Sequence, residues 1–168
     1  MPSPASIRFN PDTAGSSAAT TPPRWDLSDL YASVSDPAVQ ADFAALEGQS
    51  KAFCEKWKGR LASLSPAELA GVFDEYESIE QGLGRIGSFS QLLFAAHTTD
   101  AECGRFAQSV QERLTDISAY LLFFSLEINR IEDQTLDALT ADPAMEKWRP
   151  YLRDLRVFRP YQLSDEVE

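Results

Sequence analysis

Histidine and cysteine are scarce in this chain, which has only His97, Cys54 and Cys103 in 168 residues. A helical zinc hydrolase site of the His-Glu-x-x-His type needs two histidines, so these residues cannot form one. The cysteines lack a Cys-x-x-Cys spacing, which excludes a thioredoxin-like redox motif and a zinc knuckle. We therefore expect two buried free thiols in a reducing cytosol, and a structural helix-end or interhelix role for His97.

Basic residues are also in short supply. The 15 Lys and Arg face 26 Asp and Glu, which gives a formal net charge of −11. Nucleic acids and anionic membranes bind proteins that have an excess of positive charge, so neither is expected as a partner. Solubility explains this acidity more simply than a specific basic partner does.

Long hydrophobic runs are missing too. No stretch reaches the roughly 20 apolar residues that a transmembrane helix needs. The longest candidate, YLLFFSLEI, is much shorter and contains Glu127, which we expect to border the core. The alternatives for Glu127 are a structural ion pair or a contact to another part of a larger protein. No secretory signal pattern opens the chain, so we expect a soluble, cytoplasmic protein.

Residues 1–24 are dominated by Ser, Ala, Thr and Pro and have almost nothing to bury, which predicts a disordered tail. Two arginines give only thin support to the alternative of a transit peptide. The folded domain is expected to span residues 25–168. Its hydrophobic content is sufficient for a packed core, because 43% of the chain is hydrophobic and 11% aromatic.

Helical periodicity with clear start and stop signals follows the tail. Ser35 or Asp36 can cap a first helix that ends at Gly59. Ser65 and Glu68 form a capping box for a second helix. Further helices follow in the same rhythm, without strand-like alternation. The pattern predicts an all-α fold of about four to six helices, arranged as antiparallel hairpins in a bundle.

A third helix is expected over residues 103–130, with Thr99 as its cap and Glu102 three positions later. Between Tyr120 and Leu126 this helix is apolar nearly all the way round, so it must be covered on several sides. We expect part of that cover to be missing, which would leave an exposed apolar side. Shorter helices are predicted after Asp133 and after Asp142.

Three glycines, at 82, 84 and 87, interrupt the second helical pattern and suggest a kink or a close helix approach. They match the dinucleotide motif G-x-G-x-x-G literally, but no strand precedes them, so we interpret the match as accidental. A turn at residue 98 brings Arg85 near Glu112, and we predict an ion pair between them across this hairpin.

The segment FDEYESIE carries four acids that could be imagined as a carboxylate metal site. It lacks partnering Glu-x-x-His pairs, so a solvated helix face is the better interpretation. No residue of this chain is therefore predicted to be catalytic, cofactor-binding or metal-binding. The acids of this segment are Asp74, Glu75, Glu77 and Glu80.

Four stretches resemble the N-terminal region of oligoendopeptidase F, a zinc metallopeptidase related to thimet oligopeptidase. They are RWDLSDLYAS at 24–33, RIGSFSQLLFAAHTTDAECGRF at 85–106, QERLTDISAYLLFFSLEINRI at 111–131 and WRPYLRDLRVFRPYQLSDEVE at 148–168. The resemblance covers essentially everything after the tail and keeps the expected order.

The resemblance implies a largely helical, cytoplasmic enzyme that cleaves short peptides in a deep channel, whose entrance the N-terminal helices shape. Its zinc ligands and catalytic glutamate belong to a downstream domain and have no counterpart here. We therefore expect this chain to be inactive alone, to bind no zinc, and to have that missing catalytic domain as its partner. The alternative is a stand-alone helical interaction module that has no catalytic activity.

The closing stretch QLSDEVE begins like a helix, with Ser164 as an N-cap followed by two acids. In the family the sequence continues past such a stretch into further helices. The expectation is thus that the chain is truncated at residue 168 and is the front part of a longer enzyme.

Overall fold

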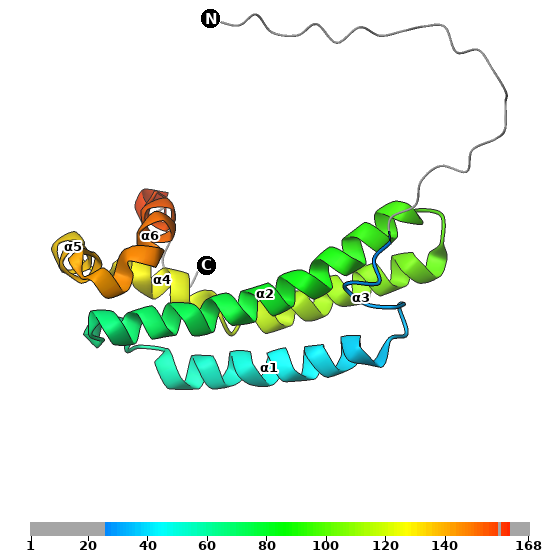
Figure 1. Ribbon diagram of the computed structural model, residues 1–168, viewed down its shortest axis with the longest axis horizontal. Helices are drawn as coiled ribbons and strands as arrows, with labels where there is room; N and C mark the ends of the chain where they lie inside the picture. The colour runs from blue at the N-terminus through cyan, green and yellow to red at the C-terminus, as the bar shows by residue number, and fades with distance from the viewer. Residues whose placement is uncertain (1–25, 158, 162–168) are drawn as a thin grey trace, which may run out of the picture.

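The computed structural model of the chain describes residues 26–157 and 159–161 (Figure 1). The predicted tail at 1–24 and the helix start at Ser164 lie outside these residues. The described residues form helices and no strand, which confirms the all-α prediction. The α-helices are α1 (Pro37–Trp57), α2 (Pro66–Ala96), α3 (Ala101–Ser118), α4 (Leu122–Arg130), α5 (Asp133–Ala141) and α6 (Arg149–Arg156). The 3-10 helices are η1 (Leu61–Ser63), η2 (Pro143–Trp148) and η3 (Arg159–Tyr161).

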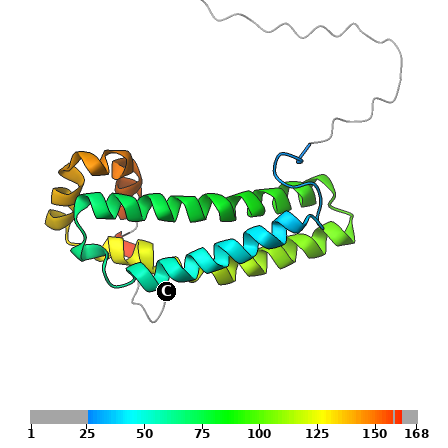
Figure 2. The same ribbon diagram turned by 60° about the horizontal axis from the view of Figure 1, so that its bottom comes forward.

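The three long helices lie side by side and form an elongated layer (Figures 1 and 2). A short turn joins α2 to α3 as an antiparallel hairpin, and α1 packs along one side of both. The helices α5 and α6 rise from one end of this layer, next to the first half of α2 (Figure 1). The molecule therefore has a long arm and a short arm that meet at an angle.

Local signals set most helix ends. Asp36 caps α1, and Gly59 follows that helix with a positive φ of 79° that favours glycine. Ser65 and Glu68 form the predicted capping box at the start of α2. The cap of α3 is Asp100, where we predicted Thr99. Its carboxylate accepts hydrogen bonds from two backbone N–H groups of the first turn, which satisfies donors that the helix leaves free.

The helix α2 continues through all three glycines, so a close approach explains this segment better than a break does. The approach occurs at Gly82, where a Cβ atom would lie 2.5 Å from a side-chain atom of Leu46 on α1. Glycine at this position lets α1 pack close to α2. The interpretation of G-x-G-x-x-G as accidental agrees with this helical setting.

The predicted single helix over 103–130 is wrong, because the chain turns at residues 119–121 and divides it into α3 and α4. The turn directs Leu121, Phe123 and Phe124 into the core, where they are 3%, 7% and 0% exposed. Of the large apolar side chains in this segment, Tyr120 and Leu122 are the exposed ones. The expected apolar side is thus mostly covered by the change of helix direction.

An aromatic cluster joins the two arms. The ring of Phe124 stacks on Tyr76 of α2 at 4.2 Å and meets Phe73 edge-on at 4.9 Å. It also lies 5.9 Å from the ring of Phe53 on α1. Phe73 stacks in turn on Trp148 of η2 at 5.1 Å. Burial of these large side chains stabilises the position of α4 and η2 on the long arm.

Glu127 borders the core as predicted, since its side chain is half-buried. Its Oε1 accepts a hydrogen bond of 2.6 Å from the backbone N–H of Gly59. This N–H lies just beyond the end of α1, so the carboxylate ties α4 to the turn between α1 and η1. A local structural role therefore accounts for the acid in this apolar stretch.

The predicted ion pair between Arg85 and Glu112 is wrong. Arg85 lies on the α1 side of α2, where its guanidinium donates to the carbonyl of Leu30 at 2.7 Å and pairs with Asp42 at 3.9 Å. It also lies over the ring of Tyr31, 4.7 Å from the centroid. Glu112 instead accepts a hydrogen bond from Gln108 on its own helix. Arg85 is therefore held by Leu30 and Tyr31, which precede α1, and by Asp42 on α1.

Both cysteines are free, as expected, but only Cys103 is buried. Cys54 is half-buried on α1, so the prediction of two buried thiols is wrong for that residue. Burial raises the pKa of the Cys103 thiol, with a further contribution from Asp100. This thiol therefore stays protonated and is a poor nucleophile.

The cap of α1 makes a prediction about pH. Backbone N–H groups of Ala32 and Ala38 donate to the Asp36 carboxylate and hold its pKa below the usual value. Its contribution to stability is therefore complete above about pH 4 and is lost as the pH falls through the folded-state pKa. In Asp36→Asn the amide oxygen still caps but does not titrate. Urea unfolding at several pH values below about 4 should show a shallower pH dependence for Asp36→Asn than for the parent chain, and identical slopes would contradict this.

Candidate functional site

One face of α2 is covered along its first half and open along its second half. In the first half, Phe73 stacks on Trp148 and Glu77 pairs with Lys147 at 2.7 Å, so η2 occupies this face. Helical spacing carries the same face onward to Gly84 and Gln91. There the short arm has ended, and a groove lies between α2 and α3.

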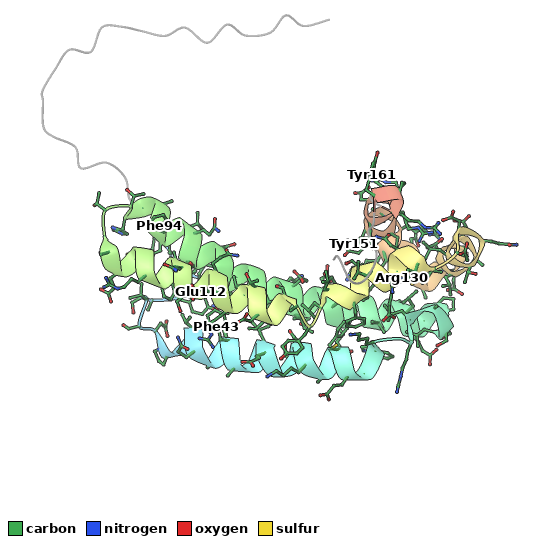
Figure 3. All side chains as sticks on the ribbon, turned by 180° about the vertical axis from the view of Figure 1, so that it is seen from behind. Phe43, Phe94, Glu112, Arg130, Tyr151 and Tyr161 are labelled. Atoms are coloured by element: carbon green, nitrogen blue, oxygen red, sulfur yellow. The ribbon has the colours of Figure 1, made fainter. Side chains whose placement is uncertain are left out.

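The groove has a volume of about 880 Å³, with an apolar floor and an uncharged polar rim. Leu83 and Leu114 contribute to the floor, while Gln91 of α2 and Gln111 of α3 contribute amide groups to the lining. Phe94, which is 40% exposed, lies at the end nearest the α2–α3 turn (Figure 3). Such a surface can contact apolar side chains and also hydrogen-bond to polar groups between them.

Small residues keep the groove deep. A Cβ atom at Gly84 would meet no atom within 4 Å, so this glycine faces open space. At Gly87 a Cβ atom would lie 3.2 Å from Leu114 of α3, which shows how closely the helices approach there. The two glycines and Ser88 form a stripe of small side chains on α2. From the sequence we interpreted the glycines as a kink or a close helix approach and did not predict a groove, although their shared face was a signal for one.

Two tyrosines lie where the short arm meets α2. Tyr151 of α6 packs edge-on against Phe73 at 5.8 Å and points toward the long arm (Figure 3). Burial raises the pKa of Tyr151, and burial together with the nearby Glu80 carboxylate raises the pKa of Tyr76. Both phenols therefore stay neutral at physiological pH. The corner between the arms therefore carries two neutral phenols beside the Glu80 carboxylate.

Among the described residues, no group of three or more His, Cys, Asp or Glu side chains could hold a metal ion. The acids that we considered as a carboxylate site hold other residues: Asp74 and Glu77 bind Lys147, and Glu75 accepts from the Trp57 indole at 2.9 Å. The residues here do not fit the catalytic zinc of a peptidase.

His97 lies where we expected a structural histidine, at the C-terminal end of α2. Its backbone N–H donates to the carbonyl of Phe94, and its carbonyl accepts from the backbone N–H of Asp100, so it shapes the α2–α3 turn.

Within the described part of the chain, no helix has the length and apolar character needed to cross a membrane.

A family model described as oligopeptidase F, for the N-terminal region of M3 peptidases, matches residues 127–168. The match begins inside α4 and includes α5 and α6. No curated protein and no solved structure matches the chain. The resemblance over residues 24–126 stays a prediction. The match supports the predicted resemblance to the N-terminal region of an oligoendopeptidase-like protein over residues 127–168.

Proposed function

We propose that this chain is the helical, channel-shaping N-terminal part of a cytoplasmic, zinc-dependent oligoendopeptidase that hydrolyses short peptides. The observation that carries the proposal is the family match over residues 127–168. The lack of a fitting metal site in the described residues is consistent with a scaffold role. In this proposal the zinc and the catalytic residues belong to a separate catalytic domain, the partner of this chain.

The groove between α2 and α3 is the surface that suits this role. Its rim is uncharged although the whole chain has a net charge of −11. An uncharged rim with amide and hydroxyl groups suits a peptide, whose backbone donates and accepts hydrogen bonds at every residue. We propose that the groove forms part of the wall along which peptides reach the catalytic domain.

The native reading frame beyond codon 168 tests this proposal. We expect it to continue and to encode a His-Glu-x-x-His motif downstream. A stop codon directly after Glu168 would instead favour the stand-alone interaction module. The chain alone should not hydrolyse an internally quenched peptide in the presence of zinc. Turnover that persists after contaminating proteases are removed would contradict the scaffold role.

Filling the groove makes a sharper prediction. Gly84→Leu places a side chain in open space within the groove. Gly71→Leu is the control, because it places the same side chain in open space on α2 outside the groove. Each change should stabilise α2 by up to about 1 kcal/mol, because glycine is a poor helix former. In the zinc peptidase that contains this chain, only Gly84→Leu should lower kcat/KM for short peptides, by roughly tenfold.

Two measurements check this prediction. Thermal unfolding should show that neither leucine destabilises the chain, which separates a folding defect from a filled groove. Equal kcat/KM values for the two variants would show that the groove takes no part in peptide hydrolysis.

A further inference from the structure

A second pocket lies between α5 and α6, and polar contacts at its two ends fix the helices against each other. At one end, Arg149 donates to the carbonyls of Thr140 and Ala141 at 2.7 and 3.2 Å. At the other end, Arg156 bonds Asp133. The start of α6 therefore faces the end of α5, and the two helices run antiparallel.

Between these ends the helices enclose a volume of about 640 Å³. Leu136 and Leu152 form an apolar floor and are only 6% and 2% exposed. Halfway along the antiparallel register, Asp137 of α5 lies on one wall and Arg153 of α6 on the other. The pocket has the size of ordinary small-molecule sites.

The two charges at the middle of the pocket are available to a ligand. Within the described part of the chain, the Asp137 carboxylate makes no hydrogen bond or ion pair; the Thr140 hydroxyl donates to the backbone carbonyl of Asp137, at 3.1 Å. Among the described residues, Arg153 pairs only with Asp154, its neighbour in sequence, and the two side chains are 74% and 68% exposed. An exposed pair of this kind is worth little and is easily exchanged for another carboxylate.

The other charges of the pocket are already committed. Arg149 caps the carbonyls at the end of α5, and Arg156 holds Asp133 together with the carbonyls of Ile128 and Asn129. One available charge of each sign then remains, above an apolar floor. A polyanion such as a phosphate would meet the Asp137 carboxylate, whereas a molecule with a positive and a negative end satisfies both walls.

We propose that this pocket binds the two charged ends of a short free peptide. Arg153 takes the C-terminal carboxylate, Asp137 takes the N-terminal ammonium, and an apolar side chain rests on Leu136 and Leu152. The proposal rests on the proposed function, since short peptides are the substrates and products of that enzyme. It assigns to the family-matched part of the chain a site for peptide ends, separate from the groove.

The dipeptide Ala-Leu is the probe, with N-acetyl-Ala-Leu-amide as the control that lacks both end charges. Titration of the 168-residue chain, followed by NMR chemical shifts of the backbone amides, should show saturable changes centred on α5 and α6. We expect a Kd near 1 mM, as suits two charge-assisted contacts on a partly exposed site. The blocked peptide should bind at least roughly tenfold more weakly.

Variants that remove one charge test whether Arg153 and Asp137 bind the ends of the peptide. Arg153→Gln and Asp137→Asn should each weaken binding of Ala-Leu by roughly tenfold. The matched variants Arg105→Gln and Asp116→Asn, on exposed positions of α3, should leave it unchanged. All four should retain the thermal unfolding midpoint of the parent chain, which excludes misfolding as the cause.

The proposal is overturned if Ala-Leu causes no saturable change, if the blocked peptide binds equally well, or if the two pocket variants bind like the α3 variants. Because the assay measures binding and not hydrolysis, its failure leaves the peptidase proposal intact. Conversely, if the longer protein proved to have no peptidase activity, the binding of Ala-Leu to the 168-residue chain would still stand as measured.

Discussion

Replacing Phe124 with alanine should lower the free energy of unfolding by about 3–5 kcal/mol, the largest effect we expect from a single substitution. The side chain is 0% exposed and contacts aromatic rings from α1 and α2. Its removal leaves a cavity between the long arm and α4, and rigid neighbouring rings can fill that cavity only in part. Chemical unfolding, followed by circular dichroism, measures the loss.

The matched control is Leu122→Ala, two residues earlier on α4. Leu122 is 45% exposed, so its truncation should change stability by less than about 1 kcal/mol. If the two variants were equally stable, Phe124 would not be the centre of the packing between the arms. A large loss for Leu122→Ala would indicate that this side chain is covered in solution.

Arg156→Ala should cost about 2–3 kcal/mol. The guanidinium side chain is only 13% exposed, donates to the carbonyls of Ile128 and Asn129 at 3.0 and 2.7 Å, and pairs with Asp133. Both carbonyls belong to the end of α4. The Ile128 carbonyl also accepts from the backbone N–H of Ile131 at 3.3 Å, so truncation removes its second donor and, among the described residues, leaves the Asn129 carbonyl unsatisfied next to the core. The same hydrogen bonding from Arg156 is the main reason that the pKa of Asp133 lies below its usual value.

Arg153→Ala is the control for this prediction, because Arg153 lies on the same face of α6 but is 74% exposed. Its loss should change the free energy of unfolding by less than about 0.5 kcal/mol. Arg156→Lys should recover only part of the stability, since an ammonium cannot reproduce the planar fork of donors. Complete recovery of stability by lysine would contradict the assignment of the guanidinium as a donor to two carbonyls and one carboxylate at once.

The sequence was most informative where a few neighbouring residues determine the structure. Asp36, Gly59 and the Ser65–Glu68 capping box act within a single turn, so their patterns predict the helix ends directly. Asp100 in place of Thr99 is a shift of one residue at such an end. Hydrophobic periodicity likewise predicts the class of fold, because each long helix needs one apolar face.

Contacts between distant segments were less accessible to prediction. The turn at residues 119–121 contains no glycine or proline, so no local signal marks it. The turn accompanies the burial of Phe123 and Phe124, which favours this change of helix direction. Similarly, the partners of Arg85 depend on which face of α2 meets α1. A hairpin register alone does not specify that face.

The groove between α2 and α3 could not be predicted for a related reason. The groove lies on the second half of α2, beyond the end of the short arm. The position of the short arm depends on the packing of Trp148 and Lys147 on the first half of α2. The stripe of Gly84, Gly87 and Ser88 was visible in the sequence as small residues at helical spacing. Its meaning depends on which neighbouring helices cover that face.

The central proposal is that these helices are a scaffold and hold no catalytic zinc of their own. Zinc content per chain, measured on the 168-residue protein after incubation with excess zinc and extensive dialysis, tests it most directly. We expect far less than one zinc per chain, because the described residues bring no three suitable ligands together. One tightly held zinc per chain would contradict the account.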